Sequence, residues 1–151
     1  MSKFIYKMQN ILNIKYKLEE QARLEFAAAN RHLMEEEEIL MQVRERQALY
    51  EQEGRRLRQE SISVVRLREN RAAMQYMEQR EKQQQTRVQK AQKAVDEKME
   101  QLTDTMKERK AQEKLRENAF ADFIQEENAR ESKEIDELVS FNYGRKQREE
   151  Q

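Results

Sequence analysis

The residue types that most often form metal sites are scarce in this chain. His32 is the only histidine and there is no cysteine, so no second imidazole and no thiolate is present to complete a site. The run Glu35 to Glu38 could suggest a cation site, but consecutive helical residues point about 100° apart, so their carboxylates diverge. We therefore predict no metal ligands, and we expect His32, which precedes Leu33, to flank a helix–helix seam.

Catalytic motifs are equally scarce. Gly54 and Gly144 are the only glycines and are isolated, so the sequence holds no glycine-rich loop that could cradle a phosphate. No serine stands in a visible arrangement with the histidine and an acid for nucleophilic catalysis. The sequence predicts a protein that is not an enzyme, with no catalytic residue, no cofactor and no small-molecule substrate.

A basic segment and a pair of methionines are the remaining candidates for binding. Residues 54–71 carry six arginines against Glu60 and Glu69, a net charge of +4, which could contact nucleic acid or acidic lipid. The whole chain has zero net charge, and this segment lacks the interleaved aromatic residues that stack on bases, so a surface facing a protein is favoured. Met74 and Met77 predict either a contact patch or packing inside the molecule.

Long helices must position these residues, because the chain has no proline and only two glycines. Proline costs about 3 kcal/mol inside a helix, and glycine about 1 kcal/mol relative to alanine. Charged residues make up 40% of the chain and hydrophobic residues 36%, too polar for a thick globular core. Zero net charge and periodic apolar residues argue against disorder. The lack of cysteine, of an apolar run of ~18–20 residues and of a signal-peptide pattern predicts a soluble cytoplasmic protein.

The first third of the chain has the apolar spacing of a coiled-coil seam. Alternate steps of four and three residues from Met1 average the 3.5 residues of a helix stripe that faces a partner helix. Lys15, Glu19, Glu36 and Gln47 interrupt this stripe and are expected to help fix the register of pairing. The apolar members are Met1, Ile5, Met8, Leu12, Ala22, Phe26, Ala29, Leu33, Leu40, Val43, Tyr50 and Leu57.

The predicted fold is all-α, with two long helices forming an antiparallel coiled-coil hairpin over residues 1–144 as a single domain. Helix one is expected over about residues 3–57 and helix two over about residues 62–141. The turn is expected within about residues 54–63, although one continuous rod stays open because a single glycine does not force a turn. A charged tail, residues 145–151, is expected to follow.

The turn also sets the expected pairing. Ser61 and Ser63 are candidate N-caps, because their hydroxyls can accept the free amides of a new helix. A turn centred near residue 60 places residue i beside roughly residue 120 − i, so Phe4 and Ile5 should meet the neighbourhood of Phe120. Helix two then extends past this level, and about twenty of its residues should overhang.

Charge is polarised in a way that favours the same pairing. Residues 122–139 carry seven acids against Arg130 and Lys133, a net charge of −5, whereas residues 1–18 carry four lysines and no acid. Antiparallel pairing brings these two segments together. Surface attractions of this kind are weak at physiological salt, so they orient the helices more than they stabilise them.

Two segments resemble the family of the flagellar export protein FliJ. Phe4 to Leu12, followed by Lys17 to Ala22, is similar to the start of that family, and Glu127 to Leu138 looks like its acidic closing motif. The resemblance implies a cytoplasmic part of the flagellar type III export apparatus, peripherally associated with the inner face of the cell membrane at the flagellar base. It also implies a coiled-coil stalk whose partners are the flagellar export ATPase hexamer, the export gate membrane protein and export chaperones, with no nucleic acid.

The resemblance further implies where the partners bind. The end that faces the ATPase would be the paired termini, and the surface that faces the gate would lie on helix two near the turn. The partner-binding residues expected on this basis are Met74, Tyr76, Met77, Phe4, Ile5, Glu134, Asp136 and Glu137.

Two other classes of function stay open. A generic structural coiled-coil scaffold or adaptor, such as a homodimer of hairpins, would share the same periodicity, and a monomer mass by light scattering would disfavour it. A nucleic-acid-binding hairpin would use the arginines near the turn, and binding that weakens steeply with salt would distinguish it.

Overall fold

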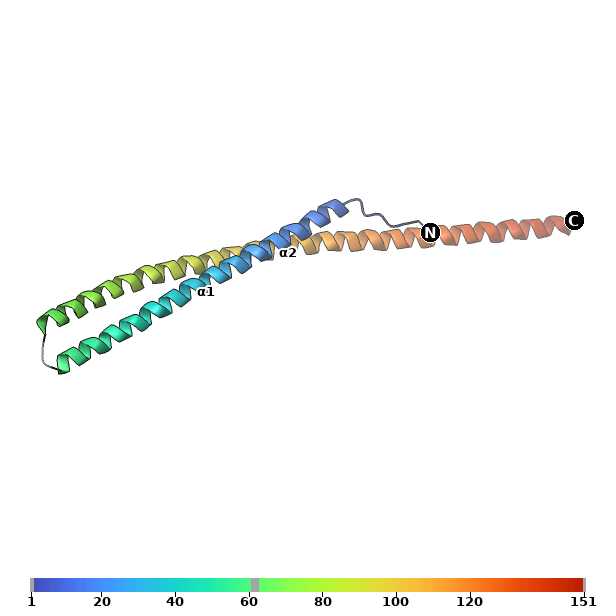
Figure 1. The fold of residues 1–151 in the computed structure, drawn as a ribbon. Helices are drawn as coiled ribbons and strands as arrows, with labels where there is room; N and C mark the ends of the chain where they lie inside the picture. The colour runs from blue at the N-terminus through green and yellow to red at the C-terminus, as the bar shows by residue number, and fades with distance from the viewer. Residues whose placement is uncertain (1, 61–62, 151) are drawn as a thin grey trace. The chain divides into compact units, whose positions relative to one another are not determined.

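The computed structural model describes residues 2–60 and 63–150 and consists of two long helices (Figure 1). Helix α1 spans Gln9–Gln59 and helix α2 spans Val64–Glu149. The described residues form no strand, and the two helices pack against each other as a hairpin. The predicted all-α fold class is therefore confirmed.

The contacts divide the chain into two units. Unit 1 comprises Met1–Glu19 and Thr105–Gln151, and unit 2 comprises Glu20–Asp104. In unit 2, a stretch of α1 runs antiparallel to the first part of α2. In unit 1, the first turns of α1 and the segment before them lie along the later part of α2 (Figure 1).

One narrow stripe supplies the buried surface. Every predicted seam position from Leu12 to Leu57 is buried or half-buried, which confirms the seam over this range. The 3.5-residue spacing is the reason, because it keeps a single face of α1 against its partner. The buried cluster of unit 2 and the side chains packed on it are Leu33, Ala91, Val95, Phe26, Ala29 and Val88.

Polar residues inside the seam of unit 2 are paired across it. The Gln84 amide donates hydrogen bonds to the backbone carbonyl of Glu36, at 2.9 Å, and to its carboxylate. The Asn70 amide donates to the backbone carbonyl of Tyr50, also at 2.9 Å. Both amides belong to α2 and both carbonyls to α1, and the two pairs lie two heptads apart along each helix. They therefore recur in phase with the coiled coil and fix its register.

The turn falls where the sequence predicts it. The hydroxyl of Ser63 accepts a hydrogen bond from the backbone N–H of Arg66 at 3.4 Å, so the predicted cap at Ser63 is confirmed. The other candidate cap, Ser61, lies outside the described residues. Gly54 lies inside α1 and not in the turn, since a lone glycine weakens a helix without ending it.

The two outer helix ends differ from the prediction. Helix α1 begins at Gln9 and not near residue 3. Residues 2–6 have no regular secondary structure, and a turn at residues 7 and 8 leads into the helix. Helix α2 continues through Gly144 to Glu149, so the predicted end near Phe141 and the separate tail are wrong.

This change of conformation also alters which early residues pack. Phe4 is half-buried against Phe120, as predicted, but Ile5 is 77% exposed and Met8 is 39% exposed. The prediction that Ile5 and Met8 continue the seam is therefore wrong. The 3.5-residue spacing of the seam applies only inside a helix, and both residues precede the start of α1 at Gln9.

The contact between Gly54 and Asn70 gives a test of the register. A Cβ atom at Gly54 would lie 2.6 Å from Oδ1 of Asn70, whose amide is held by the Tyr50 carbonyl. Gly54→Ala should cost about 1 kcal/mol of unfolding free energy, because displacing the buried amide outweighs the gain in helix propensity. In an Asn70→Ala background the same change should stabilise by about 1 kcal/mol.

Urea denaturation followed by circular dichroism measures the four free energies of this cycle. Gly144→Ala is the matched control, because a Cβ there meets nothing within 4 Å, and its effect should not depend on residue 70. Equal effects of Gly54→Ala in both backgrounds would contradict the proposed coupling.

Candidate functional site

An aromatic cluster in unit 1 fastens the segment before α1 to α2. The ring centroid of Phe4 lies 5.2 Å from that of Phe120, edge to face, and 5.4 Å from that of Phe123. The guanidinium carbon of Arg116 lies 5.6 Å from the centroid of the Phe4 ring. Edge-to-face rings and a cation over a ring are both favourable, so Phe4 anchors a segment that has no regular secondary structure.

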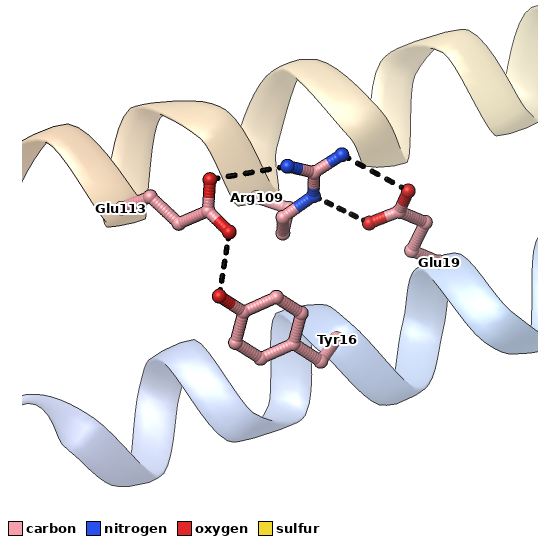
Figure 2. Close-up of polar contacts among 4 residues, drawn as sticks. All are labelled: Tyr16, Glu19, Arg109 and Glu113. Atoms are coloured by element: carbon pink, nitrogen blue, oxygen red, sulfur yellow. Dashed lines mark hydrogen bonds and ion pairs between the residues drawn. The ribbon is translucent and has the colours of Figure 1, made fainter.

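A polar cluster crosses the helix pair of unit 1 (Figure 2). Arg109 of α2 binds the carboxylate of Glu19 through two nitrogens, at 2.6 and 3.2 Å, and binds Glu113 through its third nitrogen at 3.1 Å. The hydroxyl of Tyr16 donates to the other oxygen of Glu113 at 2.5 Å. Glu19, which interrupts the predicted seam, is buried and satisfied by this bidentate pair.

The charges in this cluster support one another. The pKa of Glu113 is lowered because the Tyr16 hydroxyl and then Arg109 bind its ionised form, although desolvation opposes the shift. The pKa of Tyr16 is raised, chiefly because its neutral hydroxyl donates to Glu113. The pKa of Arg109 is raised by its hydrogen bond to Glu19 and its contact with Glu113. These shifts favour an ionised Glu113, a neutral Tyr16 and a charged Arg109.

Beyond the Phe4 contacts, α2 has a largely exposed stretch within unit 1, in which Arg130 donates a hydrogen bond to the Ser2 hydroxyl at 3.3 Å. Residues 128–150 are exposed except for Gly144, in agreement with the predicted overhang. Hydrophobic side chains recur there at helical spacing, with Ile135, Leu138 and Val139 each about 60% exposed. The predicted partner-binding acids Glu134, Asp136 and Glu137 lie on this same exposed stretch.

Near the turn, unit 2 has an open groove of about 370 Å³ between its helices. Its lining includes Ile39 and Tyr50 from α1 and Tyr76 and Met77 from α2. Tyr76 is 59% exposed, whereas Met77 is only 5% exposed. Of the two alternatives for Met77, the structure therefore favours packing inside the molecule, whereas Tyr76 is exposed to solvent.

A second groove of unit 2, of about 390 Å³, contains the third residue expected at the gate, Met74. Its lining also includes the carboxylates Glu51, Glu78 and Glu81. The structure thus brings Tyr76 and Met77 together but separates them from Met74. The sequence could not reveal this division, because it depends on how α1 divides the surface of α2.

Sequence reasoning did not single out the polar cluster of unit 1. Two spacings could have indicated it, since Tyr16 and Glu19 are three residues apart and Arg109 and Glu113 are four apart. The sequence does not show that these two residue pairs face each other across the two helices. His32 behaves as expected: it flanks the seam, 59% exposed, with its Nε2 atom 3.8 Å from a carboxylate oxygen of the buried Glu36.

The comparison with protein families identifies the chain. The family model described as flagellar FliJ protein matches residues 3–148. The chain belongs to the FliJ family. No curated protein and no solved structure matches it.

Membership of the FliJ family makes this protein a component of the flagellar export apparatus. The family is a structural, non-catalytic part of that apparatus. Within the described residues, neither helix has a stretch long and apolar enough to cross a membrane. The same residues contain no group of three or more acidic or histidine side chains placed to hold a metal ion.

The polar cluster predicts a pH dependence of stability. Because the pKa of Glu113 is lower in the folded state than its usual 4.5, its stabilisation is complete above pH 4.5 and is lost as the pH falls through the folded-state pKa. Glu113→Gln should therefore lower the melting temperature at pH 7, and the difference from the wild type should shrink below pH 4.5. Thermal unfolding followed by circular dichroism measures both.

Two further variants complete this test. Tyr16→Phe should also destabilise at pH 7, and its effect should fade as the pH rises past the usual tyrosine pKa of 10.0 through the raised folded-state pKa. Glu126→Gln removes an exposed carboxylate of α2 and serves as the control. A Glu113→Gln effect that is the same at pH 3 and pH 7 would refute the role assigned to the carboxylate.

Proposed function

We propose that this protein is a two-helix stalk of the flagellar export apparatus. In this role it binds the export ATPase hexamer through unit 1 and the export gate through the turn-proximal part of unit 2. Export chaperones are further partners, and binding to the gate holds the protein at the inner face of the cell membrane. ATP turnover belongs to the ring, and the stalk promotes assembly of the ring and its activity without catalysing a reaction itself.

The observation that carries the ATPase proposal is the exposed stretch of α2 around Leu138. Ile135, Leu138 and Val139 form an apolar stripe next to acidic side chains, with no residue of the described chain covering it. Contiguous exposed apolar surface of this kind marks protein–protein contacts. A surface that alternates apolar and acidic residues suits a partner with a basic rim and apolar pockets.

The physical form of a helix pair supports this role. Each α-helix with its side chains is about 10–12 Å across, so a pair is narrow enough to enter the central opening of a protein ring. Because side chains project all round such a pair, several subunits of a ring can contact it at once. The Phe4 cluster and the Arg109 cluster hold the early and the late segment of unit 1 together while the ring subunits bind.

Charge reversal of the acidic stretch tests the ATPase proposal. The variant combines Glu134→Lys, Asp136→Lys and Glu137→Lys, and the purified protein is added to the export ATPase at equal concentration. The wild type should increase the hexamer fraction and ATP turnover, and the variant should lose most of this increase. Analytical ultracentrifugation and a phosphate-release assay provide the two readings.

The chain offers a matched control for this variant. Glu35→Lys, Glu37→Lys and Glu38→Lys make the same change in net charge on exposed residues of unit 2 and should leave the stimulation intact. Helix content at 222 nm confirms that both variants fold. No gain in hexamer or turnover with the wild type would refute the proposed function, and equal loss in the control would refute the assignment of the surface.

A further inference from the structure

Two arginines at the Tyr76 groove of unit 2 are available for a partner. Arg46 of α1 and Arg80 of α2 both line the groove and are exposed. Neither makes a hydrogen bond or an ion pair within the described part of the chain. Arg44 differs, because its Nε atom pairs with a carboxylate oxygen of Glu81 at 3.3 Å. The groove thus presents two guanidinium groups whose donors have no partner within the described residues.

The groove also has apolar and aromatic lining residues. Ile39, Tyr50, Tyr76 and the buried Met77 all line it, and Tyr76 keeps 59% of its surface exposed. Tyrosine and arginine are the residues most often found at the energetic centres of protein interfaces, because they offer large contact area together with directed hydrogen bonds. A groove between two paired helices is also the place where a third helix packs.

The neighbouring groove has the opposite chemistry. It is lined by Glu51, Glu78 and Glu81 with Arg71 and the half-buried Met74. Both grooves lie at the same level of unit 2 and have similar volumes, about 370 and 390 Å³. Shape alone therefore does not choose between them, whereas charge does: an acidic segment is attracted to the first groove and repelled from the second.

We propose that the Tyr76 groove binds an acidic amphipathic helix of a protein partner. The apolar face of that helix packs on Tyr50, Tyr76 and Met77, and its flanking carboxylates pair with Arg46 and Arg80. Arginine suits this task because its planar guanidinium can bind a carboxylate through two nitrogens. The inference rests on the proposed function in taking the export gate as the partner, and it adds the chemistry of the segment that docks.

A nucleic acid is a weaker candidate for the same groove. Only two free guanidinium groups are present, and the carboxylates of Glu51, Glu78 and Glu81 lie in the neighbouring groove, where they repel a phosphate backbone. The buried Met77 and the aliphatic Ile39 favour apolar side chains over bases. A single-stranded DNA probe is included below so that this alternative is tested directly.

Designed peptides test the charge preference with the full-length chain. The probe is a fluorescein-labelled peptide of about twenty residues with leucines at heptad spacing and glutamates beside them, and its partner peptide has lysine at every glutamate. Fluorescence anisotropy should show binding of the acidic peptide that weakens with salt, and binding of the basic peptide at least about tenfold weaker.

Variants locate the site. Arg46→Gln with Arg80→Gln should weaken binding of the acidic peptide about tenfold or more, and Tyr76→Ala should weaken it comparably. Arg31→Gln with Arg87→Gln is the matched control, since it removes two exposed arginines of unit 2 that lie outside the groove, and it should bind like the wild type. Thermal unfolding should be unchanged in every arginine variant, because the replaced side chains have no internal partner.

The outcomes separate this inference from the proposed function. Failure of the wild type to bind the purified gate protein would refute the gate assignment, whatever the peptides do. Gate binding that is equal for the wild type and the Arg46/Arg80 variant would overturn the inference while leaving the proposed function intact. Equal binding of the acidic and basic peptides, or tighter binding of a 20-nucleotide DNA strand than of the acidic peptide, would also overturn it.

Discussion

Each helix of this protein leaves most of its surface in water and buries one stripe of side chains against the other helix. Polar helices of this kind are marginal alone, so their stability comes from the shared stripe. The stripe also contains polar groups, and a buried polar group without a partner costs about 1–3 kcal/mol. Gln84 satisfies Glu36 and Arg109 satisfies Glu19, so correct register is the condition on which the buried surface depends.

The narrow buried stripe also determines where a binding surface can lie. Beside the buried stripe, most of the described residues of both helices face solvent. The proposed contacts accordingly use side chains that lie just beside the stripe, such as Tyr76 and Arg46 in unit 2. The buried Met77 also lines this groove, and its packing between the helices positions the neighbouring exposed side chains. In this proposal the buried Met77 stabilises the helix pair, and its exposed neighbour Tyr76 binds the partner.

Sequence reasoning predicted much of this fold and part of the candidate site. The seam from Leu12 to Leu57, the turn, the Ser63 cap and the contact of Phe4 with Phe120 all follow from spacing and residue type. The ends of the helices did not: the lone Gly144 is tolerated inside α2, and Phe4 belongs to a non-helical segment before α1. The four-residue cluster around Arg109 was missed, since its members come from two segments about ninety residues apart.

The sequence by itself determined that the chain forms long helices and which stripe they bury, because these are properties of local spacing and composition. The family was recognised from the likeness of the sequence to that of known members. Only the tertiary structure decided which carboxylate meets which arginine, that Tyr76 and Met74 lie in different grooves, and that Arg46 and Arg80 share a groove. The reason is geometric: each of these facts depends on the relative register of two distant segments, and a shift of one turn, about 5.4 Å, would assemble different neighbours from the same residues.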